Sequence, residues 1–141
     1  MSGEVLEGGC LCGAVSYQVR GPFTLFAHCH CSRCRKASGA AHATALYANP
    51  ANLTWTSGRD SVVRFDLPSA RSFSTAFCKS CGSPLPHTTR SGRELIVPAG
   101  SLDTEPTTAQ PTSHGHWESR AGWSCGPDAL PCFAAADDGK T

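Results

Sequence analysis

Cysteine is the residue type whose number and spacing most favour chemistry in this chain. Nine of the 141 residues are cysteine. Seven of them lie in three short clusters: Cys10-Leu11-Cys12, Cys29-His30-Cys31-Ser32-Arg33-Cys34 and Cys78-Lys79-Ser80-Cys81. Thiolates are preferred ligands of zinc and other soft metals, and they are also redox-active nucleophiles. The clusters therefore predict metal binding, with redox pairs or chance spacing as the competing interpretations.

The third cluster has the spacing of a zinc knuckle. Cys78 and Cys81 are separated by two residues and followed by Gly82, which tolerates the positive φ that such a turn requires. A closed structural zinc site needs four ligands, and Cys10 and Cys12 can supply the other two. Such a site would close a long loop and restrain the unfolded chain. We therefore expect a structural zinc on these four cysteines.

The second cluster offers three thiols, Cys29, Cys31 and Cys34, without a fourth cysteine nearby. Three protein ligands and one open position are the arrangement of a catalytic zinc, and the open position suits water or a substrate thiol. A thiol redox site is one alternative. The other is a second structural site, closed by a neighbouring histidine: His28, His30 or His42.

The same three histidines are the nearest candidates for moving a proton, because imidazole titrates near neutral pH. His30, inside the second cluster, is assigned a catalytic role with its three cysteines, although each histidine is alternatively a solvated or structurally bonded side chain. His114 and His116 are weaker candidates. Arg33, Arg35 and Lys36 can offset thiolate charge and attract an anionic substrate, or they form a solvated helix face. The isolated cysteines are expected to be ordinary core or surface residues: Cys125 and Cys132.

The remaining sequence predicts a mostly β protein with one or two short helical turns, because Gly and Pro are frequent and charged residues sparse. Ala14–Val19 alternates between apolar and polar residues, as a half-buried strand does. A short helix is expected over Cys31–Ser38, ending at Gly39. Further strands are expected at Phe23–Ala27, Ala43–Tyr47, Leu53–Thr56, Ser61–Asp66, Arg71–Phe77 and Glu94–Val97, and loops at Pro84–His87 and Glu105–Thr112.

Charge and length restrict the function classes. Twelve basic and eleven acidic residues give a net charge of +1, which argues against broad nucleic-acid binding. No apolar run is long enough to cross a bilayer, and no signal peptide is visible, so we expect a cytoplasmic protein without membrane partners. We expect one domain over residues 1–141, with its core at about 8–133, as a monomer or homodimer.

With the clusters assigned, the chain resembles the glutathione-dependent formaldehyde-activating enzyme (Gfa) family, also called the CENP-V/GFA family. The resemblance rests on cysteine motifs in the same order, followed by short motifs toward the C-terminus. These motifs are Gly9-Cys10-Leu11-Cys12-Gly13, His28-Cys29-His30-Cys31-Ser32-Arg33-Cys34, Trp55-Thr56-Ser57-Gly58, Phe77-Cys78-Lys79-Ser80-Cys81-Gly82, Ala99-Gly100-Ser101-Leu102-Asp103, and Trp123 with Leu130-Pro131.

The resemblance implies a small zinc-bound β-tent fold of short antiparallel sheets. It implies two Zn²⁺ per chain: a structural zinc on Cys10, Cys12, Cys78 and Cys81, and a labile active-site zinc on Cys29, Cys31 and Cys34. The implied activity is the joining of formaldehyde to glutathione, giving S-hydroxymethylglutathione; in reverse this is a carbon–sulfur lyase reaction. The partner would be a small thiol such as glutathione.

Departures from the family bear on the substrate. The family has an apolar segment and a proline near its C-terminal tryptophan, where this chain has Gly115, His116 and Gly122. The chain also lacks a longer N-terminal extension. Two alternatives therefore stay open: a lyase acting on another small molecule, and a non-catalytic, zinc-stabilised binding module. An open fourth position at the second cluster favours an enzyme, whereas a fourth protein ligand favours a purely structural role.

Overall fold

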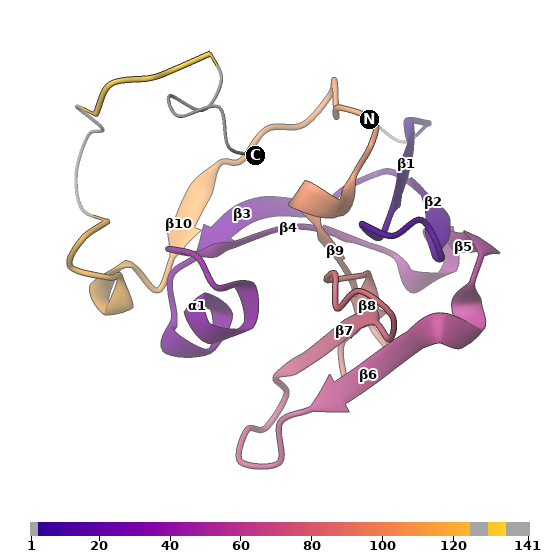
Figure 1. Ribbon diagram of the computed structural model, residues 1–141, viewed down its shortest axis with the longest axis horizontal. Helices are drawn as coiled ribbons and strands as arrows, with labels where there is room; N and C mark the ends of the chain where they lie inside the picture. Colours follow the sequence, from indigo (N-terminus) through magenta and orange to yellow (C-terminus); the bar gives the residue numbers. More distant parts are fainter. Residues whose placement is uncertain (1–2, 125–129, 135–141) are drawn as a thin grey trace.

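The computed structural model describes residues 3–124 and 130–134, and its regular structure is mostly short β-strands (Figure 1). The first sheet is antiparallel, in the order β1-β2-β5. Its strands are β1 (Val5–Gly9), β2 (Ser16–Arg20) and β5 (Leu53–Ser57). The loop between β1 and β2 carries Cys10 and Cys12, so this sheet presents two of the predicted zinc ligands.

The second sheet has the order β10-β3-β4-β9-β8. Its neighbours pair antiparallel except β10, which runs parallel to β3. The strands are β3 (Leu25–Cys29), β4 (Ala43–Ala48), β8 (His87–Thr88), β9 (Leu95–Pro98) and β10 (Ser113–Gly115). Because β10 lies beside β3, a segment near the end of the described chain reaches the second cysteine cluster.

A separate antiparallel hairpin is formed by β6 (Val62–Asp66) and β7 (Ser74–Cys78), and it projects from the sheets in Figure 1. The α-helix α1 (Ser32–Ser38) follows β3 directly and ends at Gly39, which has a left-handed φ of 66°. Short 3-10 turns complete the described part: η1 (Pro50–Asn52), η2 (Arg59–Ser61), η3 (Ala99–Ser101) and η4 (Trp117–Ser119). No helix in the described residues is both long and apolar enough to cross a membrane.

The apolar core lies beneath the alternating strand β2. Val15, Tyr17 and Val19 are almost completely buried, as the alternation predicts. The Tyr17 hydroxyl lies 2.6 Å from Ser101 Oγ, which satisfies its polar end inside the core. Other buried members of this core are Leu6, Leu46, Leu85, Leu95 and Val97.

The mostly β fold class of short sheets with a short helix is confirmed, with differences in detail. The loop predicted at Pro84–His87 is wrong at its end, since His87 begins β8. Three strands were not predicted: β1, β8 and β10. Polar residues and glycines occupy most of β1 and β10, and β8 has two residues, so none carries a readable alternation.

Candidate metal centres and active site

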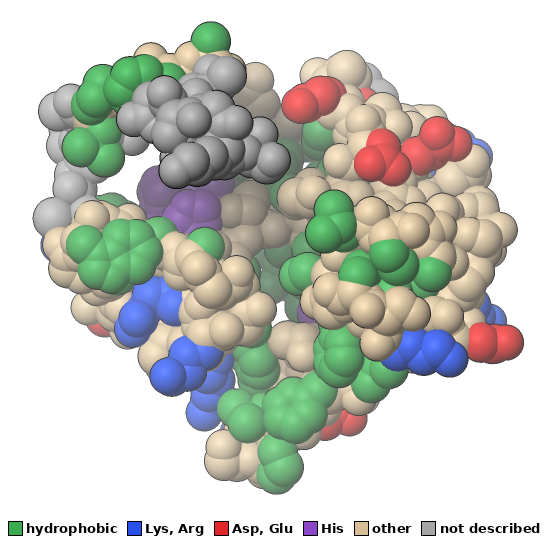
Figure 2. All heavy atoms as spheres, viewed as in Figure 1, with side chains coloured by type: hydrophobic (Ala, Val, Ile, Leu, Met, Phe, Trp, Pro, Cys, Tyr) green, Lys and Arg blue, Asp and Glu red, His purple; other side chains and the backbone are tan. Residues whose placement is uncertain are grey.

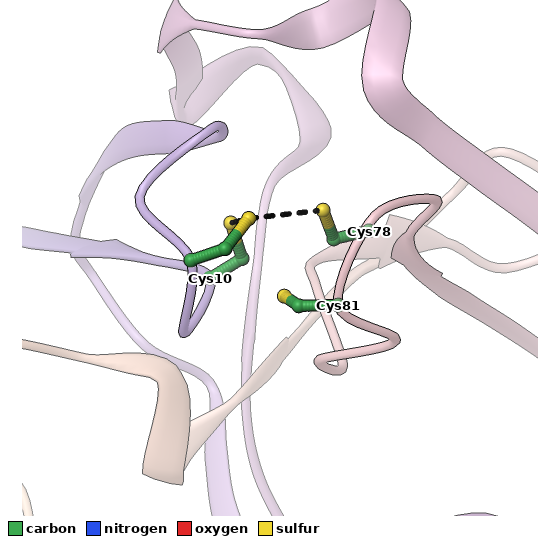
Figure 3. Close-up of side chains that lie close together, drawn as sticks. Cys10, Cys78 and Cys81 are labelled. Carbon is green, nitrogen blue, oxygen red and sulfur yellow. Dashed lines mark hydrogen bonds between the residues drawn. The ribbon is translucent and has the colours of Figure 1, made fainter.

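Four cysteines from two distant segments converge in the structure. Cys10 and Cys12 come from the loop after β1, Cys78 is the last residue of β7, and Cys81 lies in the turn that follows. Their sulfur atoms all lie within 4.8 Å of one another. Figure 3 shows the side chains of Cys10, Cys78 and Cys81 pointing toward a common centre.

The sulfur spacing of this four-cysteine cluster matches the chemistry of a tetrahedral zinc site. The Sγ atoms of Cys10 and Cys12 are 3.6 Å apart, and those of Cys12 and Cys78 are 3.9 Å apart. Zinc–sulfur bonds of about 2.3 Å in a tetrahedron place the sulfurs roughly 3.8 Å from one another. The donor set therefore fits a closed Cys₄ zinc.

The turn after β7 is shaped to present its two thiols. Gly82 has a φ of 75°, and its N–H donates to the carbonyl oxygen of Cys78 over 2.8 Å. Ser83 Oγ lies 3.2 Å from Cys81 Sγ and accepts the Leu11 N–H over 3.0 Å. The Ser83 hydrogen bond lowers the pKa of Cys81 to about 5, which favours the ligating thiolate. Ser83 thus links both cysteine loops.

The three thiols of the second cluster also converge, where β3 gives way to α1. Cys29 ends β3, Cys31 is the N-cap of α1, and Cys34 lies one turn into the helix. Their sulfurs lie within 4.8 Å of one another, and all three residues are half-buried. The Cys34 N–H donates to Cys31 Sγ over 3.3 Å, so a thiol occupies the usual place of a capping hydroxyl.

The second cluster has the ligand count predicted for an open metal site. In residues 3–124 and 130–134, no histidine or carboxylate joins its three sulfurs at ligating distance. Burial raises the pKa of the Cys34 thiol, and a bound cation at this cluster would favour its thiolate form instead. Three convergent thiols with one position left for another ligand are compatible with zinc.

Four histidine rings pack together beside the same end of β3. The ring of His28 lies 4.3 Å from that of His42 and 4.9 Å from that of His114, between centroids. The ring of His30 lies 5.0 Å from each of these two rings. We call His28, His30, His42 and His114 the histidine cluster; histidine side chains are visible in a recess in Figure 2.

Hydrogen bonds divide the histidine cluster into two connected pairs. His30 Nε2 lies 2.9 Å from His114 Nδ1. Thr44 Oγ1 lies 2.8 Å from His28 Nδ1 and 3.0 Å from His42 Nδ1, so this hydroxyl bridges the other pair. Burial lowers the pKa of both His28 and His30, which favours the neutral form of their rings.

His30 is the most enclosed member of the histidine cluster. Its side chain is 1% exposed, and its Nδ1 atom has no hydrogen-bond partner among the described residues. The Trp117 ring packs edge-on against it at 4.9 Å, and Arg120 lies 4.5 Å from the Trp117 ring centroid. A buried nitrogen without a hydrogen bond is rare in folded proteins, so the Nδ1 atom of His30 has unused hydrogen-bonding capacity.

The structure gives His114 a more central place than the sequence predicted. The parallel pairing of β10 with β3 sets His114 opposite His28 and within reach of His30. His116, the other weak candidate, has a left-handed φ of 52° and precedes η4. The sequence segment that could have indicated this position is Ser113-His114-Gly115-His116. Nothing in that segment specifies the strand with which it pairs.

The remaining candidates belong to neither group of converging sulfur atoms. Arg33 and Lys36 are exposed on α1, whereas Arg35 is half-buried and its Nε has no partner in the described part of the chain. Arg35 and Lys36 lie in the last turn of α1, where positive charge stabilises the helix. Cys132 is exposed, and Cys125 lies outside the described residues.

A family model described as "Glutathione-dependent formaldehyde-activating enzyme" (GFA) matches residues 5–119, which include both cysteine clusters. The chain belongs to this family. The GFA-family assignment predicted from the cysteine motifs is therefore confirmed. A crystal structure of a Rhodobacter sphaeroides protein from the Northeast Structural Genomics effort is similar, with 26% sequence identity and a TM-score of 0.60, and the match covers 77% of this chain and 99% of that one. No curated protein matches the chain.

Proposed function

We propose that this GFA-family protein is a zinc-dependent enzyme of the carbon–sulfur lyase type that makes and breaks adducts of a small thiol with an aldehyde. Glutathione and formaldehyde are the leading pair. The observation that carries the proposal is the three-sulfur cluster of Cys29, Cys31 and Cys34 beside the histidine cluster, in which His30 is buried. An open metal position and a proton carrier are the two groups that such a reaction requires.

The cysteine clusters take different roles in this proposal. Cys10, Cys12, Cys78 and Cys81 hold a structural zinc, and Cys29, Cys31 and Cys34 hold the active-site zinc. When bound at the second cluster, zinc supplies a Lewis acid that stabilises a substrate thiolate, the nucleophilic form of the thiol. Because the three cysteines are half-buried, only a small molecule can reach their sulfur atoms.

His30 moves the proton in the proposed reaction. As the carbon–sulfur bond forms, the thiol loses a proton and the carbonyl oxygen gains one, so the product is a hemithioacetal. His30 Nδ1 is the free nitrogen that exchanges this proton with the hydroxyl oxygen. The hydrogen bond between His30 Nε2 and His114 Nδ1 holds the ring in place and allows the proton to be replaced from the other side.

Basic side chains of α1 favour anionic thiols. Arg33, Arg35 and Lys36 lie on α1, the helix that also carries Cys34, and none of the first-turn residues of α1 is acidic. Their field attracts a thiol that bears carboxylates, as glutathione does. A non-catalytic binding module would need neither the attraction of an anionic thiol nor a proton carrier. A kinetic experiment therefore distinguishes the enzyme from the binding module.

The test is exchange NMR on a mixture of formaldehyde, glutathione and S-hydroxymethylglutathione. The zinc-loaded protein should accelerate exchange, the Cys31→Ser variant should not, and the exposed-cysteine variant Cys132→Ser should match the wild type. Other thiols and aldehydes are assayed in the same way to define the substrate. If neither glutathione nor any other common thiol exchanges faster than with Cys31→Ser, the chain is a binding module.

A further inference from the structure

We propose that a groove between α1 and the β6–β7 hairpin binds a small carboxylate with an apolar body. The groove encloses about 280 Å³. Its lining residues are Arg33, Lys36 and Ala37 from α1 and Phe65, Leu67, Phe73 and Thr75 from the hairpin. In Figure 2, basic side chains border an apolar patch on this face of the molecule.

The apolar wall of the groove is supplied by the hairpin. Phe65 is 47% exposed, and Leu67 and Phe73 beside it are half-buried. An exposed phenyl ring next to two other apolar side chains is a surface from which a ligand can displace water. The groove therefore favours an alkyl or aryl group over a fully polar molecule.

The wall is held in position by Arg90, which comes from outside the hairpin. Its guanidinium donates hydrogen bonds of 2.6–3.3 Å to backbone carbonyls of the segment that connects β6 to β7. These carbonyls belong to Leu67, Ala70, Arg71 and Phe73. A wall fixed in this way is preformed, so a ligand does not bear the entropic cost of ordering it.

The opposite wall is positively charged. Arg33 and Lys36 are one helical turn apart on α1, and the small side chain of Ala37 leaves space beside them. In the part of the chain that the structure describes, neither side chain pairs with a carboxylate. The nearby Asp66 is already bound by Arg64 and Ser74. Two unpaired cations and no lining carboxylate favour an anionic ligand over a neutral or cationic one.

Size and polarity together define the ligand class. Small-molecule sites commonly enclose roughly 300–1,000 Å³, so this groove suits a ligand at the small end of that range. A medium-chain fatty acid combines a carboxylate for Arg33 and Lys36 with an alkyl chain for the phenylalanines. Glutathione lacks an apolar body, and no cysteine or histidine lines the groove, so octanoate binding is tested independently of the proposed function, although Arg33 and Lys36 take part in both.

The test is a titration of the zinc-loaded, full-length protein with octanoate, followed by two-dimensional amide NMR. Saturable shifts are expected at Arg33, Lys36, Phe65 and Phe73, and octanol should bind about tenfold more weakly, because it lacks the charge. The double variant Arg33→Gln/Lys36→Gln should weaken octanoate binding by at least about tenfold. The matched double variant Arg59→Gln/Arg93→Gln, which removes two exposed charges outside the groove, should bind as the wild type does.

A second variant tests the apolar wall. Phe65 is half-exposed, so Phe65→Ser leaves the core intact and should weaken octanoate binding while leaving the folded spectrum in place. The proposal is overturned if octanoate does not bind saturably at millimolar concentration, or if the shifts fall outside the groove. It is also overturned if octanol binds as tightly as octanoate, or if the Arg33→Gln/Lys36→Gln variant binds as the wild type does.

Discussion

The two cysteine clusters use the same ligand atom but join very different lengths of chain. Cys12 and Cys78 are 66 positions apart, and their sulfurs are 3.9 Å apart. In contrast, Cys29 and Cys34 lie within one strand end and one helical turn. A cross-link between distant segments restrains the unfolded chain far more than a local one does. Chain separation, rather than ligand type, therefore distinguishes the cluster that we propose to be structural from the one that we propose to be reactive.

The groups that surround the two cysteine clusters also differ. The four-cysteine cluster is surrounded by backbone N–H groups and the Ser83 hydroxyl, which stabilise thiolates but do not titrate near neutral pH. The three-cysteine cluster adjoins His28 and His30 and, through them, two further histidines. Among the described residues, imidazole side chains are thus gathered beside the three-cysteine cluster.

The largest expected effect is that of Cys81→Ser. Structural zinc contributes on the order of 10–16 kcal/mol in small zinc domains, which exceeds the usual stability of a fold, about 5–15 kcal/mol. The variant should lose cooperative unfolding, measured by circular dichroism during thermal denaturation, and should lose metal, measured by mass spectrometry. Cys132→Ser is the control: Cys132 is exposed and should change stability by less than about 0.5 kcal/mol. If the Cys81→Ser protein folds cooperatively and keeps its full metal content, the four-cysteine cluster is not the structural site.

Chelation should separate the clusters without mutation. Three protein ligands bind a metal less securely than four, so a chelator added stepwise should remove the metal of the Cys29, Cys31 and Cys34 site first. Exchange activity should disappear with this first equivalent, while the far-ultraviolet spectrum stays unchanged. Simultaneous loss of activity and of secondary structure would show instead that both sites are structural.

Acidification should lower the stability of the fold by a smaller amount. Protonation of His87 accounts for one part of this loss. Burial lowers the pKa of His87 to about 4, from about 6.5 in an unfolded chain. The unfolded state therefore binds the proton first, and stability that is complete above about pH 6.5 is lost as the pH falls toward 4. The loss reaches about 3 kcal/mol at most.

The neutral variant His87→Gln should lack this part of the acid sensitivity. Urea unfolding of both proteins at about pH 7 and about pH 4.5 measures it as the change in their stability difference. His87 belongs to neither cysteine cluster, so the pair of proteins separates imidazole protonation from the protonation of ligating thiolates. An identical pH dependence in the two proteins would rule out the contribution of His87.

The smallest expected effect is a difference in stability between two variants of Cys31. It distinguishes the role of Cys31 as a metal ligand from its role as the N-cap of α1. Both Cys31→Ser and Cys31→Ala should abolish exchange activity, because each removes a metal ligand. Serine can still accept the Cys34 N–H at the N-cap, whereas alanine cannot, so the alanine variant should be less stable by about 1 kcal/mol. Urea denaturation of the two variants provides the comparison. Equal stabilities would show that the thiol does not cap α1.

The zinc knuckle of Cys78 and Cys81 could be predicted, because it is a local pattern that specifies two ligands and their turn. The burial of Tyr17 and the helix at Ser32–Ser38 were also predictable, from alternation and from residues that neither break a helix nor branch at Cβ. These features depend on neighbours in the sequence. The sequence motifs likewise identified the GFA family, which the match over residues 5–119 confirms.

The histidine cluster was only partly predictable, because it depends on which strands become neighbours. β10 consists of Ser113, His114 and Gly115, which have no apolar alternation to set a register. Its place beside β3 is determined by tertiary packing, and only this pairing brings His114 to His30. The groove beside α1 has the same origin, since its two walls come from segments about thirty residues apart.

The most direct test of the contrast between the clusters is cadmium-113 NMR of the cadmium-substituted protein, since thiolates also bind this soft metal. Two resonances are expected, one from each cluster, and only one of them should shift when glutathione is added. That same resonance should be absent from Cys31→Ser, while the other persists. A single resonance, or two resonances that both ignore glutathione and every other small thiol, would contradict the assignment of an open, thiol-binding site to Cys29, Cys31 and Cys34.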